Sequence, residues 1–302
     1  MPELPEVETI SKGLDKKLKN KKITRIWTDW PKYFKLHKNE KDFSRQIIGK
    51  KILKVSRRGK NILFYLSEKH ILLIHLKMTG HLLIGEWKQN RSEKLGEKWQ
   101  GQKWVPTKDG GPLTDPFNRF IRLIFFLDNG KMLALSDVRR FAKVLCGVEE
   151  KILNLPDIKN LGPEPLDKRF TYKKFGELFK NKKGVIKSVL MDQGFISGIG
   201  NIYSDEILWL SKIHPSRRVE GLKEKELIAI YKYIKQNLKK AIRLRGTSFS
   251  DYRDSEGRRG KYSLFRRVYQ REGEPCSRCG IEIKRIKIGA RSAHFCPICQ
   301  KE

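Results

Sequence analysis

Cys276-Ser277-Arg278-Cys279 and Cys296-Pro297-Ile298-Cys299 are two CxxC pairs separated by sixteen residues. Each pair suits a tight turn, and four thiolates at this spacing can complete a tetrahedron around one zinc ion. Four sulfur ligands leave no open coordination position, so we expect a structural zinc rather than a catalytic one. A redox-active site would need only one such pair. Alternating isoleucines between the pairs predict a short β-hairpin: Ile281, Ile283, Ile286 and Ile288.

The chain as a whole is strongly basic. Its 302 residues include 66 lysines and arginines against 34 acidic residues, a formal net charge of +32 at pH 7. This surplus suits a polyanion, either nucleic acid or an anionic membrane surface, and a basic solvated surface is the alternative. Apolar stretches such as 71–74 fall far short of the ~20 residues that a membrane-spanning helix needs, and no signal-peptide core is present. We therefore predict a cytoplasmic protein without a membrane partner, whose five cysteines form no disulfides.

Hydrophobic periodicity predicts a mainly β domain that begins with one helix. Apolar residues recur at helical spacing in the first twenty residues: Val7, Ile10, Leu14 and Leu18. Two β-hairpins are predicted, 61–66 with 71–76 and 121–127 with 132–135. The polar stretch 86–118 between them has no clear period, and we interpret it as an insertion that its tryptophans partly order.

The second half of the chain is predicted to be helical. The Gly- and Pro-containing stretch 161–166 marks a linker. After it, one apolar stripe predicts a helix with a buried face: Leu227, Ile230, Ile234, Leu238 and Ile242. Cys146, far from the other four cysteines, is expected to be a buried core thiol.

The N-terminal stretch Met1-Pro2-Glu3-Leu4-Pro5-Glu6-Val7-Glu8-Thr9 places a proline second. Removal of Met1 would expose a secondary amine, which can attack an aldehyde-like carbon and form an iminium. The alternative is that Pro2 simply opens a helix. Taken alone, the residue favours that alternative.

Five motifs, in this order, change that balance: MPELPEVET at 1–9, HLKMTG at 75–80, SDVRRF at 136–141, GIGNIYSDEIL at 198–208 and the four-cysteine module. Together they resemble the bacterial formamidopyrimidine-DNA glycosylases, which remove oxidised purines such as 8-oxoguanine from DNA. The resemblance implies an α+β multidomain fold with an N-terminal β-sandwich led by a helix, a helix–two-turn–helix domain and a C-terminal β-hairpin zinc finger. The expected domains are 1–155, with 86–118 as the insertion, 156–270 and 271–302.

The resemblance also implies catalytic roles in a bifunctional glycosylase and AP lyase of base excision repair. Pro2 would be the nucleophile and Glu3 the general acid and base. Lys60 would assist β-elimination and Arg291 δ-elimination. Each has a plainer interpretation, because an acid in a first helical turn stabilises the helix dipole and a cation can simply bind a phosphate.

Further residues that the resemblance implies would contact DNA: His75, Met78, Arg139, Phe141, Lys182 and Asn201. Met78, Arg139 and Phe141 would fill the space left by an extruded base. From the sequence alone, core packing is the favoured interpretation for the two apolar ones. Asn201 begins a helix after two glycines, where backbone N–H groups can approach a phosphate. The implied partner is double-stranded DNA with oxidised bases or abasic sites, bound by a monomer in the nucleoid.

The sequence departs from the family pattern at two places besides the insertion 86–118. Phe120 stands where a DNA-contacting histidine is usual, with Arg119 and Arg122 as candidate substitutes, and Ala142 stands where a glycine is usual. The loop 248–262 resembles the segment that closes over the lesion, and no lesion contact is assigned in it. Two alternatives remain: an endonuclease-eight-type glycosylase for oxidised pyrimidines, which Leu4, Arg139 and Phe141 disfavour, and a non-catalytic zinc-ribbon protein that binds nucleic acid.

Overall fold

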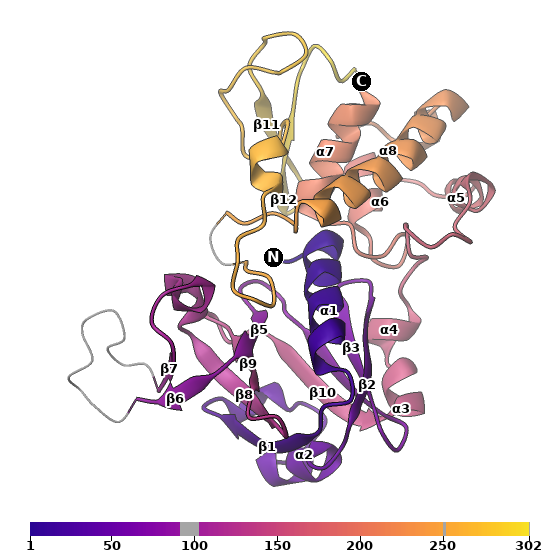
Figure 1. Ribbon diagram of the computed structural model, residues 1–302. Coiled ribbons are helices and arrows are strands. Elements are labelled where there is room, and N and C mark those ends of the chain that lie inside the picture. Colours follow the sequence, from indigo (N-terminus) through magenta and orange to yellow (C-terminus); the bar gives the residue numbers. More distant parts are fainter. Residues whose placement is uncertain (91–102, 250–251, 302) are drawn as a thin grey trace. The chain divides into compact units, whose positions relative to one another are not determined.

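The computed structural model of the protein describes residues 1–90, 103–249 and 252–301. The chain divides into two compact units (Figure 1). Unit 1 combines Met1–Lys159 with Leu244–Ser263, and unit 2 combines Asn160–Arg243 with Leu264–Glu302. The loop 248–262, in its described residues, is therefore grouped with unit 1 and not with the second domain, where it was expected. The domain limits at 155 and 270 stay a prediction.

Unit 1 contains two four-stranded antiparallel sheets, with strand orders β1-β8-β9-β5 and β10-β4-β3-β2. The strands are β1 (Ile23–Thr28), β2 (Ile52–Arg58), β3 (Asn61–Leu66), β4 (His70–His75), β5 (His81–Gly85), β8 (Ile121–Leu127), β9 (Met132–Ser136) and β10 (Lys143–Val148). Both predicted hairpins are confirmed, because β3 pairs with β4 and β8 pairs with β9.

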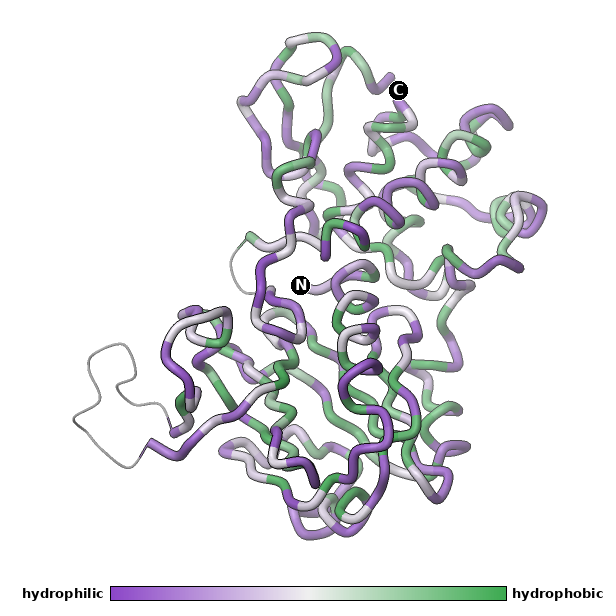
Figure 2. The backbone as a smooth tube through the Cα atoms, viewed as in Figure 1, coloured by the Kyte–Doolittle hydropathy of each residue, from purple (hydrophilic) through white to green (hydrophobic). Residues whose placement is uncertain are grey.

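One hydrophobic core joins the two sheets into a sandwich. Alternate residues of each strand enter it, such as Ile62 and Phe64 from β3 and Leu123 and Phe125 from β8. Figure 2 shows hydrophobic residues gathered along these strands. Cys146 of β10 is in this core, as predicted, and burial raises the pKa of its thiol to about 12.

The predicted first helix is confirmed as α1 (Leu4–Leu18), which packs against β2 and β3. Its apolar stripe is fully buried in the core. Lys16 and Lys17 in the last turn stabilise the helix, because their positive charges lie at the negative end of its dipole. The other helices of unit 1 are α2 (Glu40–Ile47), α3 (Glu149–Leu153) and α4 (Pro156–Lys159).

The stretch 86–118 is partly ordered by two of its tryptophans. Trp87 and Trp104 lie on β6 (Trp87–Gln89) and β7 (Trp104–Pro106), which pair, and both side chains are buried against the β1-β8-β9-β5 sheet. Trp99 lies outside the described residues. Two short 3-10 helices follow, Pro112–Thr114 and Pro116–Asn118.

Unit 2 contains α5 (Tyr172–Phe179), α6 (Ile186–Met191), α7 (Asn201–Ser211) and α8 (Glu224–Arg243), followed by the hairpin of β11 (Lys284–Ile288) and β12 (Arg291–Phe295). The predicted stripe of α8 is buried at Ile230, Ile234 and Leu238. Figure 2 shows the resulting alternation of purple and green along this helix. In the described parts of both units, no helix is long and apolar enough to cross a membrane.

Candidate active site and nucleic-acid interface

The N-terminus of α1 carries the predicted nucleophile and general acid. Pro2 and Glu3 are both buried, and Glu3 is the residue that caps the helix. The Glu3 N–H donates to Glu6 Oε2 at 2.8 Å, and the Thr247 N–H donates to Glu6 Oε1 at 2.7 Å. Glu6 therefore holds the first turn of α1 against the 244–263 segment, which is a structural role. Glu3 is then the acid beside Pro2 that is left as the candidate general acid.

The turn between β2 and β3 brings Lys60 to the same helix. Arg57 bridges the two elements, because its Nε donates to Glu8 Oε2 at 2.7 Å and its Nη1 donates to the Gly59 carbonyl at 3.0 Å. Lys60 is buried next to that carbonyl. The structure thus fixes the Lys60 turn against α1 through an arginine that the sequence analysis did not identify.

His75 lies at the end of β4 and pairs with Asn61 of β3, the residue that directly follows Lys60. Burial lowers the pKa of His75 to about 3, with smaller contributions from the positive charges of Lys77 and Lys60. Its Nδ1 accepts the Lys77 N–H at 3.0 Å. A neutral imidazole that accepts at Nδ1 carries its hydrogen on Nε2, so His75 is a hydrogen-bond donor at neutral pH.

Met78, Arg139 and Phe141 lie on two neighbouring loops and are exposed. Met78 is 37% exposed and Phe141 50%, so the expectation of core packing for these two residues is wrong. Hydrophobic periodicity could not reveal this, because it does not show whether an apolar residue in a loop packs inward or faces solvent. The Arg139 guanidinium lies 4.5 Å from the centre of the Phe141 ring.

A buried carboxylate, Asp137, fixes these two loops relative to each other. Its Oδ1 accepts the Thr79 hydroxyl at 2.5 Å, and its Oδ2 accepts the Ala142 N–H at 2.9 Å and the Tyr33 hydroxyl at 3.1 Å. The Arg139 N–H donates to the Thr79 hydroxyl at 3.1 Å. Asp137 therefore sets the positions of one residue next to Met78 and one next to Phe141, and its place in the SDVRRF motif was the signal for it.

The two candidate substitutes for the missing histidine differ in their partners. Arg122 donates to Asp29 Oδ2 at 2.8 Å in a largely buried ion pair. Arg119 forms no ion pair among the described residues, and its guanidinium lies 5.0 Å from the centre of the Phe120 ring. Of the two arginines, Arg119, which precedes β8, is therefore the better candidate to contact a ligand.

In unit 2, Asn201 and Arg291 line one cavity of about 500 Å³ at the N-terminus of α7. The Asn201 side-chain oxygen is buried there and has no hydrogen-bond partner among the described residues. Lys182 lies elsewhere in unit 2, and its Nζ donates to Asp192 Oδ2 at 3.0 Å. The structure thus brings together Asn201 and Arg291, and it gives Lys182 an acidic partner.

Two buried acids of α7 hold the hairpin and the segment before it. Asp205 pairs with the buried Lys187, and its Oδ2 accepts the His294 N–H at 3.0 Å. Glu206 accepts three consecutive backbone N–H groups, from residues Arg267 to Tyr269, at 2.8–3.0 Å. Both acids lie in the GIGNIYSDEIL motif, which assigns them no role, although two adjacent acids in an apolar helix were a signal.

The four cysteine sulfurs meet in unit 2, all within 4.8 Å of one another. Cys276 Sγ lies 4.0 Å from Cys299 Sγ, and Cys279 Sγ lies 3.4 Å from Cys296 Sγ. A tetrahedron with Zn–S bonds of about 2.3 Å has S···S edges of about 3.8 Å, so the four thiolates fit one structural zinc. Cys276, Cys296 and Ile283 also pack against Trp209 of α7.

Comparison with known proteins accounts for the whole chain. Residues 1–144 match the formamidopyrimidine-DNA glycosylase N-terminal domain, 161–253 the formamidopyrimidine-DNA glycosylase H2TH domain, and 273–301 the zinc finger found in FPG and IleRS. The formamidopyrimidine-DNA glycosylase of Desulforamulus reducens is 38% identical over 302 residues, covering 100% of this chain and 99% of that protein. The one of Pelotomaculum thermopropionicum is 39% identical over 301 residues, with the same shares of both chains.

The chain belongs to the formamidopyrimidine-DNA glycosylase family. Solved structures of the Lactococcus lactis member agree in fold. A variant of it in complex with Fapy-dG-containing DNA has a TM-score of 0.84 at 32% identity, covering 100% of both chains. Its complex with DNA containing an abasic site has a TM-score of 0.83 at 32% identity, covering 99% of this chain and 100% of that one. The predicted family, the α+β architecture and the structural zinc are confirmed.

This family member also has a buried arginine that the sequence analysis missed. Arg253 is fully buried, and its Nη2 donates to Asp115 Oδ1 at 2.8 Å and to Oδ2 at 2.9 Å. Nearby, the Asn118 side chain donates to the Pro112 carbonyl at 2.7 Å and to the Gly257 carbonyl at 3.3 Å. Gly257 has φ of +83°, and a Cβ there would lie 2.7 Å from Asn118 Nδ2. The 112–118 and 252–258 segments of unit 1 are thus closely joined.

Proposed function

We propose that this protein excises oxidised purines from double-stranded DNA, including 8-oxoguanine and formamidopyrimidines, and then cleaves the abasic strand. The observation that carries the proposal is its membership of the glycosylase family over the whole chain. Base excision repair requires access to chromosomal DNA, so the protein would act in the nucleoid. That it acts there as a monomer is part of the same proposal. The domain limits 1–155, 156–270 and 271–302 are part of the same proposal.

The proposed chemistry begins when the Pro2 amine attacks C1′ of the deoxyribose. The base leaves with its bonding electron pair, and an iminium forms between Pro2 and the opened sugar. Glu3 protonates the sugar oxygen and moves protons between later intermediates. Positive surroundings favour the neutral amine, which is the form that attacks.

Elimination of the two phosphates completes the proposed reaction. The iminium acidifies the neighbouring sugar carbon, so the 3′ phosphate leaves first and the 5′ phosphate second. Lys60 is assigned to assist the β-elimination and Arg291 to assist the δ-elimination. His75 and Asn201 bind the DNA backbone, with Lys182 as a further contact once it leaves Asp192.

Base extrusion is assigned to the two loops joined by Asp137. Met78 and Phe141 offer apolar surface to the emptied stack, and Arg139 offers hydrogen bonds to the orphaned partner base. Their exposure supports this assignment, because large apolar side chains at such positions bury surface only when a ligand covers them.

Borohydride trapping on matched duplexes tests the proposal. The zinc-loaded protein should form a covalent adduct with 8-oxoguanine and formamidopyrimidine duplexes faster than with thymine glycol, and peptide mapping should place the adduct on Pro2. The thymine glycol arm tests the pyrimidine alternative, since a Lactococcus lactis relative was solved with DNA containing an oxidised pyrimidine.

Two variants sharpen the test. Pro2→Gly should lose most of the adduct, whereas Pro5→Ala, at the next proline in the chain, should keep it. Intact mass of the trapped species must show loss of Met1. Binding without any trapped adduct would favour the non-catalytic alternative, and full trapping by Pro2→Gly would move the nucleophile to another residue.

A further inference from the structure

Unit 1 has a cavity of about 560 Å³ that no proposed site residue lines. It lies where the last turn of α1, the end of β5, the 106–113 segment and the turn between β8 and β9 meet. Lys17 lines it, and α1 rises by about 1.5 Å per residue, so this place is about 20 Å along the helix from Leu4. The cavity is therefore separate from Pro2 and Glu3.

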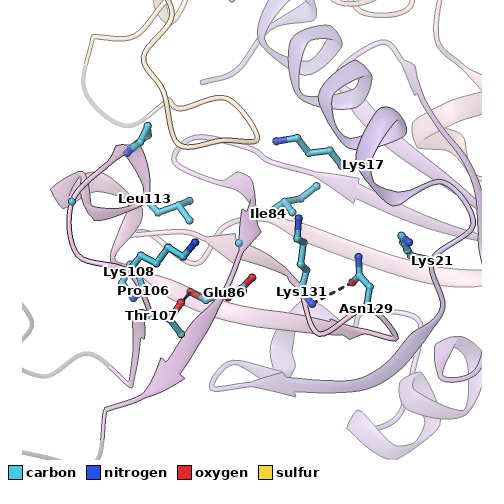
Figure 3. Close-up of a pocket in the computed structure, with 13 residues that line it drawn as sticks. Lys17, Lys21, Ile84, Glu86, Pro106, Thr107, Lys108, Leu113, Asn129 and Lys131 are labelled. Atoms are coloured by element: carbon cyan, nitrogen blue, oxygen red, sulfur yellow. Dashed lines mark hydrogen bonds between the residues drawn. The ribbon is translucent and has the colours of Figure 1, made fainter.

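Four lysines and one acid face this cavity: Lys17, Lys21, Lys108, Lys131 and Glu86. They come from four separate stretches of the chain. Lys17 pairs with Glu256 at 2.5 Å, whereas the other three lysines form no ion pair among the described residues. Figure 3 shows the side chains of Lys17, Lys108 and Lys131 extending into the space between them.

This arrangement favours a ligand with several negative charges. Like charges gathered around one cavity repel, and an anion held between them removes that cost. Glu256 offsets Lys17 and Glu86 offsets a second lysine, so the lining keeps a net charge of about +2, which an anion with at least two negative charges would balance.

Part of the cavity lining is apolar. Ile84, Pro106, Pro112 and Leu113 contribute to it. Leu113 packs so tightly over Gly85 that a Cβ on that glycine would lie 2.4 Å from Leu113 Cδ1. A preformed apolar surface next to a few polar groups is typical of sites for small molecules that have a flat apolar part.

We propose that this cavity binds a nucleoside di- or triphosphate, with the base on the Ile84 and Leu113 surface and the phosphates between Lys108 and Lys131. Its volume lies within the range of about 300–1,000 Å³ that is usual for such sites. The site is independent of the glycosylase reaction, and its ligand is a free nucleotide rather than the DNA backbone.

Calorimetric titration of the full-length, zinc-loaded protein with ATP tests this proposal in 0.15 M salt, where surface charges farther apart than ~8 Å are largely screened. One ATP should bind per chain. Lys108→Gln combined with Lys131→Gln should weaken the affinity at least tenfold. The control, Lys225→Gln combined with Lys239→Gln, removes the same charge from exposed positions of α8 and should change it less than twofold.

Two more titrants identify the ligand. Inorganic tripolyphosphate should bind the unaltered protein at least tenfold more weakly than ATP, because it lacks a base. A short 5′-phosphorylated single-stranded DNA should not displace ATP. Absence of saturable ATP binding, equal losses in the two double variants, equal affinity for tripolyphosphate, or displacement by the DNA would each overturn the proposal. Thermal unfolding midpoints of both double variants show that a loss is not a folding defect.

Discussion

Removal of the Asp115 carboxylate should destabilise unit 1 strongly, because it takes away the acceptor of two hydrogen bonds from the fully buried Arg253. The Arg253 side chain is 1% exposed and makes two hydrogen bonds to Asp115, at 2.8 and 2.9 Å. At 2.8 Å and an effective dielectric constant of about 20, the direct attraction is about 6 kcal/mol before desolvation is subtracted. Breaking one side of a buried pair costs about 3–5 kcal/mol in measured cases. We therefore expect Asp115→Ala to lower the free energy of unfolding by about 3–5 kcal/mol.

The opposite substitution should cost less, and this asymmetry tests the reasoning. In Arg253→Met, the Asp115 side chain remains 17% exposed and keeps the Phe117 N–H at 3.0 Å. Because this carboxylate is partly hydrated and keeps one donor, we expect Arg253→Met to lower the free energy of unfolding by about 1–3 kcal/mol. The double variant should be more stable than the sum of the two single losses implies, because both single variants remove the same interaction and the sum counts it twice.

Urea unfolding followed by tryptophan fluorescence measures these differences, since five of the six tryptophans belong to the sequence of unit 1. Arg258→Ala is the matched control: its pair with Glu256 lies in the same segment, the arginine is 52% exposed, and the expected loss is at most about 1 kcal/mol. A loss below 1 kcal/mol for Asp115→Ala, or equal losses for Asp115→Ala and Arg253→Met, would refute the argument from burial.

Three further outcomes are expected. Cys296→Ser should release zinc and unfold the C-terminal module, which draws on the order of 10–16 kcal/mol from metal binding; zinc content and DNA affinity equal to those of the unaltered protein would contradict this. Burial lowers the pKa of His81 to about 4, so the unfolded state takes up a proton first as the pH falls below 6.5. This group alone should lower the stability by about 2 kcal/mol between pH 7 and pH 5, and His81→Gln should lose that part of the pH dependence in urea unfolding. DNA affinity should fall by about 0.9 decade per decade of salt for each phosphate contacted, and a flat salt response in a binding titration would mean that the charge serves another purpose.

The regular elements and the metal site could be predicted from the sequence because their signals are local. The α1 stripe repeats within fifteen residues, and each hairpin has its turn between its own strands. The CxxC pairs specify a zinc tetrahedron by spacing and ligand chemistry alone. The exposure of Met78 and Phe141 had no local signal, because an apolar residue in a loop looks the same whether it packs inward or faces solvent.

The buried polar contacts could not be predicted for a different reason. Asp115 and Arg253 are 138 residues apart, and the Glu6–Thr247 contact spans 241 residues. Periodicity carries no information about such pairs, because an acid that reaches a distant partner looks the same in the sequence as one that faces water. Of these four residues, only Glu6 lies in one of the five quoted motifs, and that motif does not indicate its partner.

These buried acids also explain how the chain separates positioning from binding. Asp137, Glu206 and Glu6 face inward, where their oxygens accept hydrogen bonds that fix the loops and helix ends of each unit. Every carboxylate placed inside is one that does not offset a surface lysine, so the surface is more positive than an even spread of the acidic residues would make it. Internal acids should therefore determine the positions of the side chains proposed to react and to extrude the base, whereas surface cations determine how strongly the DNA backbone is bound. A change in ionic strength should therefore alter the DNA affinity much more than the positions of these side chains, because buried pairs are screened far less than exposed charges.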